Sequence, residues 1–350
     1  MSLYERLIND GFIDSCIYYT NYGKPVDINR LLPNNCYRFI KRFFEAGAKE
    51  RLFEISFSNE YEEQGKHVHT LVLYLLGCYF KEIINSMLLN IIDETTKTDN
   101  SWYDFRHTWF LSCFYHDVAS VIESAPILDL PTLLNKYGIK NHVLKNKSKY
   151  SMTYRPEIIE SYYEYVRNEI NKVEHGILAG FLLYDRLMKG YHDARRRTRT
   201  PMGEPFTERN VLWRKEHLDL YVIIADSIMA HNIWSIVFTN KYPDLKPLDI
   251  SARKRISMNV NPLSHFLCLF DTIEPTKRPK LGNDPIEILR SVDITYSNNK
   301  LTITLLDSVR NNACYKEWLE DVKKMEEWLE LKAELKDRNT KLEISWDALH

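Results

Sequence analysis

Residues 109–120 read WFLSCFYHDVAS, an apolar stretch that ends in an adjacent His-Asp pair, His116 and Asp117. The bulky apolar residues predict a buried helix that carries two titratable side chains. A buried His or Asp needs a partner, because an unpaired polar group in an apolar interior is costly in free energy. One such pair is weak evidence by itself, since the charged segment further on contains another, His192 and Asp193.

Four other apolar stretches each contribute one further candidate ligand, a His or an Asp. In helical bundles, metal sites are built from side chains of this kind that several helices each direct inward. Imidazole and carboxylate ligands suit a divalent transition metal, namely Mn, Fe, Co, Ni or Zn. For any one histidine alone, a hydrogen-bonded core residue is the more common outcome. The four residues are His69 in HVHTLVLYLLG, His175 in VEHGILAGFLLYDRL, His231 in ADSIMAHNIW and Asp271 in FLCLFDTIEP.

The composition predicts a folded, helical chain. Over 350 residues, a hydrophobic content of 44% and a charged content of 27% exclude disorder of the whole chain. The 11 glycines and 13 prolines are too few for a fold rich in tight turns. The net charge of −1 gives no indication of nucleic-acid binding. The six cysteines form no CxxC pair, which argues against a zinc knuckle or a thioredoxin-type motif.

The pattern of apolar residues changes along the chain. Helical spacing predicts helices over about 34–49, 66–92, 99–116, 156–189, 207–240 and 262–272. Beyond Pro279, SVDITYSNNKLTITLL predicts a β-hairpin, CYKEWLEDVKKMEEWLEL an amphipathic helix and KLEISW a last strand. We therefore expect a mainly α fold, with a helical metal-binding domain over 1–280 and a small α+β appendage over 285–350.

The length of the apolar segments and the setting of the cysteines predict where the protein is located. The longest apolar run, Thr70–Phe80, is too short to span a bilayer, and the N-terminus has no secretory signal. Cysteines in apolar helical stretches are typical of a reducing compartment. We expect a cytoplasmic protein that makes no membrane contact. The appendage either covers the bundle or mediates self-association, and in the second case the protein would be a homo-oligomer.

The order His, His-Asp, His, His, Asp resembles the HD-domain superfamily of metal-dependent phosphohydrolases. The stretches HTLVLYLLG, FLSCFYHDVAS, EHGILAGFLLYDRL and FLCLFDTIEP are similar to that family's ligand helices, and the resemblance covers about residues 66–275. It implies an HD-domain-like helical bundle with a basic metal site of four residues and two added imidazoles in the members that bind two metals. The four residues would be His69, His116, Asp117 and Asp271, and the added imidazoles would be His175 and His231.

The resemblance also implies a reaction. Two divalent metals bridged by Asp117 and a hydroxide would lower the pKa of water and clamp a phosphoryl oxygen for in-line attack. The expected function is a phosphodiesterase or nucleotidase that acts on a nucleotide or cyclic nucleotide, with Asp117 as the central catalytic residue.

A basic segment lies between the third and fourth ligand helices. Its sequence, DRLMKGYHDARRRTRTPMGEPFTERN, suits a small anionic substrate that contains phosphate, because guanidinium groups bind phosphate with two hydrogen bonds. A solvated basic loop is the alternative. Lys277 and Arg278 form a second, weaker candidate pair. The candidate substrate-binding residues are Arg186 and Lys189 at the helix end, and Arg195, Arg196, Arg197 and Arg199 in the loop that follows.

Two other functions remain open at the level of sequence. The same ligand order resembles the di-iron oxygenases of the HD superfamily, and His and carboxylate ligands suit iron as well as manganese or cobalt. Such an enzyme would act on a small anionic substrate and consume oxygen. A non-catalytic module that binds a nucleotide is the third possibility, although buried polar ligands are costly to keep once catalysis is lost.

Overall fold

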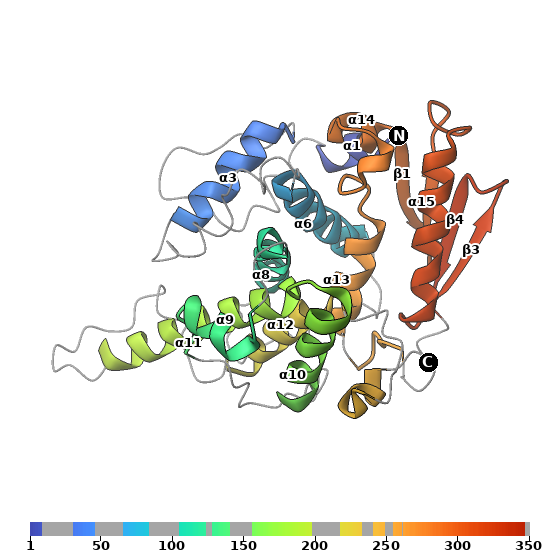
Figure 1. Cartoon of the computed structure of the whole chain (residues 1–350). Helices are drawn as coiled ribbons and strands as arrows, with labels where there is room; N and C mark the ends of the chain where they lie inside the picture. Colours follow the sequence, from blue (N-terminus) through green and yellow to red (C-terminus); the bar gives the residue numbers. More distant parts are fainter. Residues whose placement is uncertain are drawn as a thin grey trace. The chain divides into compact units, whose positions relative to one another are not determined.

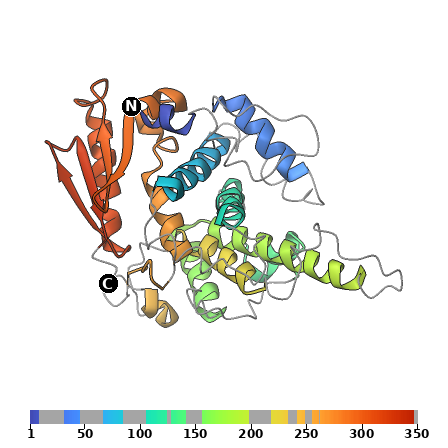
Figure 2. The same cartoon turned by 180° about the vertical axis from the view of Figure 1, so that it is seen from behind.

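A computed structural model describes residues 1–8, 31–45, 66–83, 105–123, 128–140, 156–197, 218–232, 241–248, 255–260 and 262–346. The chain divides into two compact units, which are described separately. Unit 1 comprises Met1–Ile91, Lys254–Asn259 and His265–His350, and unit 2 comprises Ile92–Arg253 and Val260–Ser264. Helices dominate, and a four-stranded antiparallel sheet lies near the C-terminus (Figures 1 and 2). The predicted mainly α class with a C-terminal α+β appendage is confirmed.

Unit 2 is helical throughout its described part. Its α11 packs along α12, and α8 packs against both. Gly180 makes the close contact between α11 and α12 possible, since a Cβ there would lie 2.8 Å from the Ala225 carbonyl oxygen. The elements are α8 (Phe105–His116), η1 (Ser120–Ile122), α9 (Leu130–Lys136), α10 (Pro156–Tyr165), η2 (Val166–Ile170), α11 (His175–Arg197), α12 (Leu218–Ala230) and η5 (Pro243–Leu248).

The prediction of one continuous helix over 156–189 is wrong, because the helix is interrupted in its middle and extends beyond residue 189. After α10 and the π-helical turn η2, Asn171 adopts φ 60° and ψ 45°, the left-handed conformation that ends a helix and that Asn tolerates. A new helix, α11, then begins at His175. It continues to Arg197 rather than ending at Lys189, because Ala and Arg favour helix and basic side chains suit a helix C-terminus.

Unit 1 contains the remaining helices. Ser2 and Glu5 form a capping box at the start of α1, and Asp284 caps α14 through the Ile286 amide. The helix α6 is buried over most of its length, as its continuous apolar sequence predicts. None of the helices within the described ranges has the length and apolar character needed to cross a membrane. The helices that precede the sheet in the sequence are α1 (Leu3–Leu7), α3 (Pro33–Glu45), α6 (Lys66–Ile83), α13 (Pro262–Ile273, in unit 1 from His265), η6 (Pro279–Leu281) and α14 (Pro285–Arg290).

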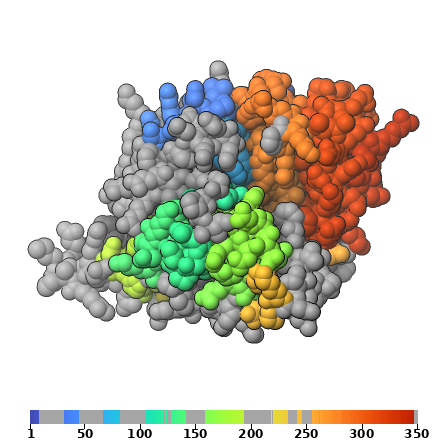
Figure 3. Space-filling view, in the orientation of Figure 1, coloured from blue at the N-terminus to red at the C-terminus, as the bar shows by residue number. Residues whose placement is uncertain are grey.

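The antiparallel sheet of unit 1 has the order β1-β2-β4-β3. The predicted hairpin is present: Ser297 pairs with Lys300 around Asn298 and Asn299, whose positive φ values suit a two-residue turn. The helix α15 packs against the sheet (Figure 1). In the space-filling view, the C-terminal segments, coloured orange to red, form one continuous surface (Figure 3). The elements are β1 (Val292–Ser297), β2 (Lys300–Leu305), α15 (Ala313–Lys323), η7 (Lys324–Glu327), β3 (Lys332–Lys336) and β4 (Lys341–Ser345).

The N-terminal helix is tied to this sheet. The guanidinium of Arg6 makes two bonds to the Asp293 carboxylate, at 2.6 Å from Nε and 3.1 Å from Nη2. A third bond, of 3.2 Å, joins Arg6 Nη1 to the Tyr79 hydroxyl on α6. Residues near both ends of the chain thus belong to one compact unit. The expected division into a helical domain over 1–280 and an appendage over 285–350 stays a prediction.

Candidate metal centre

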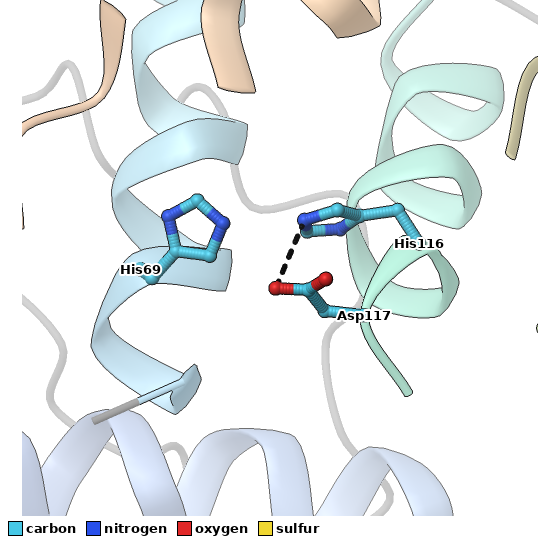
Figure 4. Close-up of side chains that lie close together, drawn as sticks. All are labelled: His69, His116 and Asp117. Atoms are coloured by element: carbon cyan, nitrogen blue, oxygen red, sulfur yellow. Dashed lines mark ion pairs between the residues drawn. The ribbon is translucent and has the colours of Figure 1, made fainter. Parts of the chain in front are cut away.

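Four of the predicted ligands lie at helix ends in unit 2. His116 is the last residue of α8 and Asp117 follows it, His175 begins α11, and His231 directly follows α12. We call these four residues the unit-2 cluster. All four are buried, with at most 8% of any residue exposed. Figure 4 shows His116 and Asp117 at the end of α8, and also draws His69 on α6, a residue of unit 1.

The Asp117 carboxylate is the centre of this cluster. Its Oδ1 lies 3.0 Å from His175 Nε2 and 3.8 Å from His231 Nε2. Its Oδ2 lies 3.5 Å from His116 Nε2, the pair marked by the dashed line in Figure 4. Asp117, His175 and His231 each offer a ligand atom within 4.8 Å of the others. Three imidazoles therefore present the same nitrogen to one carboxylate.

The other ring nitrogen of each histidine has a hydrogen-bond partner that fixes its role. His116 Nδ1 lies 2.7 Å from the Cys113 carbonyl oxygen, and His231 Nδ1 lies 2.6 Å from that of Ile228. A carbonyl only accepts hydrogen bonds, so Nδ1 carries the proton in both rings. In the neutral rings Nε2 then holds the lone pair that a metal requires.

His175 is held by carboxylates on both sides. Its Nδ1 bonds to Glu123 at the end of η1, and its Nε2 faces Asp117. Burial alone would lower the pKa of His175, but the bonds to Asp117 and Glu123 outweigh burial and raise it to about 10. Without a metal, His175 is therefore protonated at neutral pH. Metal binding by His175 and Asp117 would require the loss of that proton.

A glycine makes room for the fourth member of the cluster. A Cβ on Gly176 would lie 3.1 Å from Cε1 and Nδ1 of His231 and 3.1 Å from the Ile228 carbonyl oxygen. The His231 ring also packs edge-on against the rings of His116 and His175, with centroids 5.2 Å apart in both cases. The His-Gly sequence at the start of α11 thus allows two imidazoles to share one small volume.

The remaining predicted ligands, His69 and Asp271, meet in unit 1. His69 Nε2 on α6 lies 3.2 Å from Asp271 Oδ1 on α13, and His69 Nδ1 lies 2.7 Å from Glu274 Oε2. Asp271 is also ion-paired with Lys277. We call these four residues the unit-1 cluster. Glu274 is fully buried and accepts backbone N–H bonds from Thr276, at 2.9 Å, and Lys277, at 3.3 Å.

The His69 ring has the same arrangement as the rings of unit 2. Burial would lower the pKa of His69, whereas its bonds to Asp271 and Glu274 raise it, and the net direction is upward. Glu274 holds Nδ1, and Nε2 faces a predicted carboxylate ligand. A carboxylate on the outer nitrogen of a metal-binding histidine orients the ring and increases its basicity.

The chemistry of these donors fits a divalent transition metal. Imidazole nitrogen and carboxylate oxygen are ligands for borderline cations, and the ring orientations direct Nε2 toward carboxylate oxygens. Buried carboxylates gathered with histidines are costly unless a proton or a metal ion balances their charge. The buried His and Asp residues could therefore hold metal ions.

The predicted phosphate-binding residues lie along α11. Arg186 is half-buried, and Lys189 is ion-paired with Asp185. At a rise of about 1.5 Å per residue, their backbones lie about 17 and 21 Å along α11 from His175. The backbone of Arg195, Arg196 and Arg197 is helical, so the prediction of a loop there is wrong, and Arg199 lies outside the described residues. Phosphate binding by these side chains stays a prediction.

Two other histidines have structural surroundings. His265 Nδ1 donates to the Ile256 carbonyl oxygen at 2.8 Å, and its Nε2 accepts the Trp346 indole N–H at 3.0 Å. Burial lowers the pKa of His265 to about 4. His67 packs edge-on against the Tyr37 ring, and burial likewise lowers its pKa to about 4. Neither ring belongs to the two clusters.

Several residues that belong to the clusters or contact them are not among the ligands predicted from the sequence. Glu123 and Glu274 hold the outer nitrogens of His175 and His69, and the Asn232 side-chain amide lies 2.9 Å from His175 Nε2. The sequence predicts Lys277 as a weaker candidate for phosphate binding, whereas its ammonium pairs with Asp271. The only local signal was that Glu274 and Lys277 closely follow Asp271 in the chain.

Comparison with known proteins gives no assignment. No model of a protein family, no curated protein and no solved structure matches the chain.

Proposed function

We propose that the chain is a metal-dependent phosphohydrolase that cleaves a nucleotide or cyclic nucleotide phosphoester with two divalent transition metals. One observation supports this proposal most strongly. In four predicted ligand histidines, on different helices, Nδ1 is hydrogen-bonded and Nε2 faces an aspartate. The core histidine His265 differs, because its Nε2 accepts the Trp346 indole N–H and, among the described residues, faces no carboxylate. His69 and Asp271 of unit 1 and the four residues of the unit-2 cluster would be the ligands, as the HD-domain resemblance implies.

The residues of the chain would hold and orient the reacting groups. When bound, the two ions supply positive charge to a phosphoryl oxygen and lower the pKa of a water molecule. The two oxygens of Asp117 face different histidines, so this carboxylate is suited to hold both ions. Glu123 and Glu274 keep the protons of His175 and His69 at Nδ1.

The basic end of α11 would bind the far part of the substrate. Arg186 and Lys189 lie too far along the helix from His175 to reach a phosphoryl group held there by metals. They suit a second anionic group of an extended substrate, together with Arg195, Arg196, Arg197 and Arg199. This role predicts that their loss raises KM and leaves kcat nearly unchanged, as expected for contacts made equally in the ground and transition states.

Activity with defined metals tests the proposed function. The full chain, purified without oxygen and loaded with Mn²⁺ or Co²⁺, would be offered nucleoside monophosphates, cyclic nucleotides and bis(p-nitrophenyl) phosphate. We expect hydrolysis that falls at least about 100-fold in Asp117→Asn, because that variant loses the shared carboxylate. The matched control changes the exposed second pair, His192→Gln with Asp193→Asn, and should keep full activity.

The same samples distinguish the oxygenase alternative. Oxygen uptake that requires iron and a small anionic substrate, without phosphoester cleavage under any metal, would contradict the hydrolase. Cleavage without oxygen would support it. Equal hydrolysis by wild type and Asp117→Asn would mean that the activity belongs to a contaminant, and it would remove the support for this site.

A further inference from the structure

A pocket in unit 1 lies outside the histidine clusters. It has a volume of about 280 Å³ and lies between the chain segment that follows α13 and one face of α15. The first wall contributes Lys277, Arg278 and Lys280, and α15 contributes Glu317, Trp318 and Asp321. The α15 residues recur at helical spacing, so they share one face. A volume of this size suits a small ligand or one end of a larger one.

Most charges that line the pocket are already balanced. Lys280 pairs with Glu317 at 3.1 Å, and Asp321 pairs with Lys324 at 2.7 Å. Lys277 pairs with Asp271. Arg278 differs, because within the described part of the chain its guanidinium makes no ion pair. The bond that it does make, 3.3 Å from Nη2 to the Thr272 carbonyl oxygen, leaves its charge uncompensated.

Two lining side chains also carry buried donors without acceptors. Among the described residues, neither Arg278 Nε nor Trp318 Nε1 has a hydrogen-bond partner. Trp318 is only 4% exposed. A buried donor that lacks its hydrogen bond costs about 1–3 kcal/mol, and more for a charged group. A ligand that offered acceptor oxygens to both side chains would remove this cost.

We propose that this pocket binds a small oxyanion, with a phosphate group as its ligand. The uncompensated guanidinium requires negative charge, and the two N–H donors require acceptor oxygens. Phosphate has more acceptor oxygens than a carboxylate, so it is better suited to accept hydrogen bonds from both Arg278 and Trp318. The source is either free inorganic phosphate or the phosphate of a nucleotide. The site does not depend on the proposed reaction, because none of its donors is a proposed metal ligand.

Titration calorimetry of the full chain with inorganic phosphate tests this proposal. We expect one phosphate per chain at this pocket, weakened at least about tenfold by Arg278→Gln, which removes a charged donor. Trp318→Phe keeps the packed ring and removes the N–H, so it should weaken binding several-fold without unfolding the chain. The control is Arg290→Gln on α14, which changes the charge equally but replaces an exposed arginine paired with Glu287.

Further titrations separate this site from the metal centre and identify the ligand. Asp117→Asn should retain the pocket's phosphate binding, and loss of binding in that variant would place the phosphate at the metals and overturn the proposal. Adenosine monophosphate that competes more tightly than inorganic phosphate would support the site and name a nucleotide as the source. Acetate that binds as tightly as phosphate, or equal phosphate binding in Arg278→Gln and wild type, would also overturn it.

Discussion

Glu123 and Glu274 are the residues that give the two clusters their shared geometry. Each is a carboxylate on the outer nitrogen of a histidine whose Nε2 faces an aspartate. The sequence does not predict these two pairs, since Glu123 is 52 residues from His175 and Glu274 is 205 residues from His69. The apolar setting of the histidines showed that partners were needed, but only the fold shows which residues supply them.

Removing the outer carboxylate of His175 should weaken metal binding. We expect Glu123→Ala to lower metal affinity about 10- to 100-fold, because the His175 ring loses the group that orients it and increases its basicity. Metal titrations monitored by competition with a chelating dye would measure this. Glu169→Ala removes an exposed glutamate paired with Lys241 and serves as the control. Unchanged affinity in Glu123→Ala would argue against His175 as a ligand.

Protonation of His265 should lower the free energy of unfolding of the chain in mild acid. Its folded pKa of about 4 is below the ordinary value, so folding favours the neutral ring. The stabilisation is present above about pH 6.5, where the unfolded ring is also neutral, and it is lost as the pH falls toward 4. We expect His265→Gln to reduce the fall in unfolding free energy between pH 7 and pH 5, measured by urea denaturation. An identical fall in wild type and variant would contradict this account. His67, with a similar pKa, should account for part of the fall that remains.

The helices show which local features the sequence could predict. The apolar stretches of α6, α8, α12 and α13 are all helical, and the predicted hairpin forms. The break at Asn171 was missed because a single Asn gives no strong local signal, and the left-handed turn there depends on the surrounding packing. The strand β3 was missed because its sequence follows an amphipathic helix without a turn signal, and its strand character comes from pairing with β4.

Two glycines of α11 should have separable effects. In Gly176→Ala the new methyl group would meet the His231 ring, whereas in Gly180→Ala it would meet Met229 and the Ala225 carbonyl oxygen. We expect Gly180→Ala to lower the free energy of unfolding by about 1–3 kcal/mol through overpacking. Gly176→Ala should in addition reduce the bound metal, because it displaces a ligand. Chemical denaturation and metal analysis of both variants would show this difference. Equal metal content in the two variants would contradict a role for His231 as a ligand.

At the scale of the whole molecule, the ion pair between Arg6 and Asp293 links distant parts of the sequence. Its two charge-assisted bonds are partly buried, and such bonds contribute about 1.5–3 kcal/mol. A double-mutant cycle with Arg6→Leu and Asp293→Leu should give a coupling energy of about this size in urea denaturation. A coupling energy near zero in this cycle would contradict a stabilising role for the ion pair.

Metal binding by the buried histidines and aspartates, with Asp117 as the shared carboxylate, is the basis of the proposed function. The most direct test is the metal content of the full chain purified without oxygen, wild type against Asp117→Asn, determined by elemental analysis. The account predicts about two transition-metal ions per wild-type chain and a sharp loss in the variant. No metal in the wild type, even after reconstitution with Mn²⁺, Fe²⁺ or Co²⁺, would contradict it.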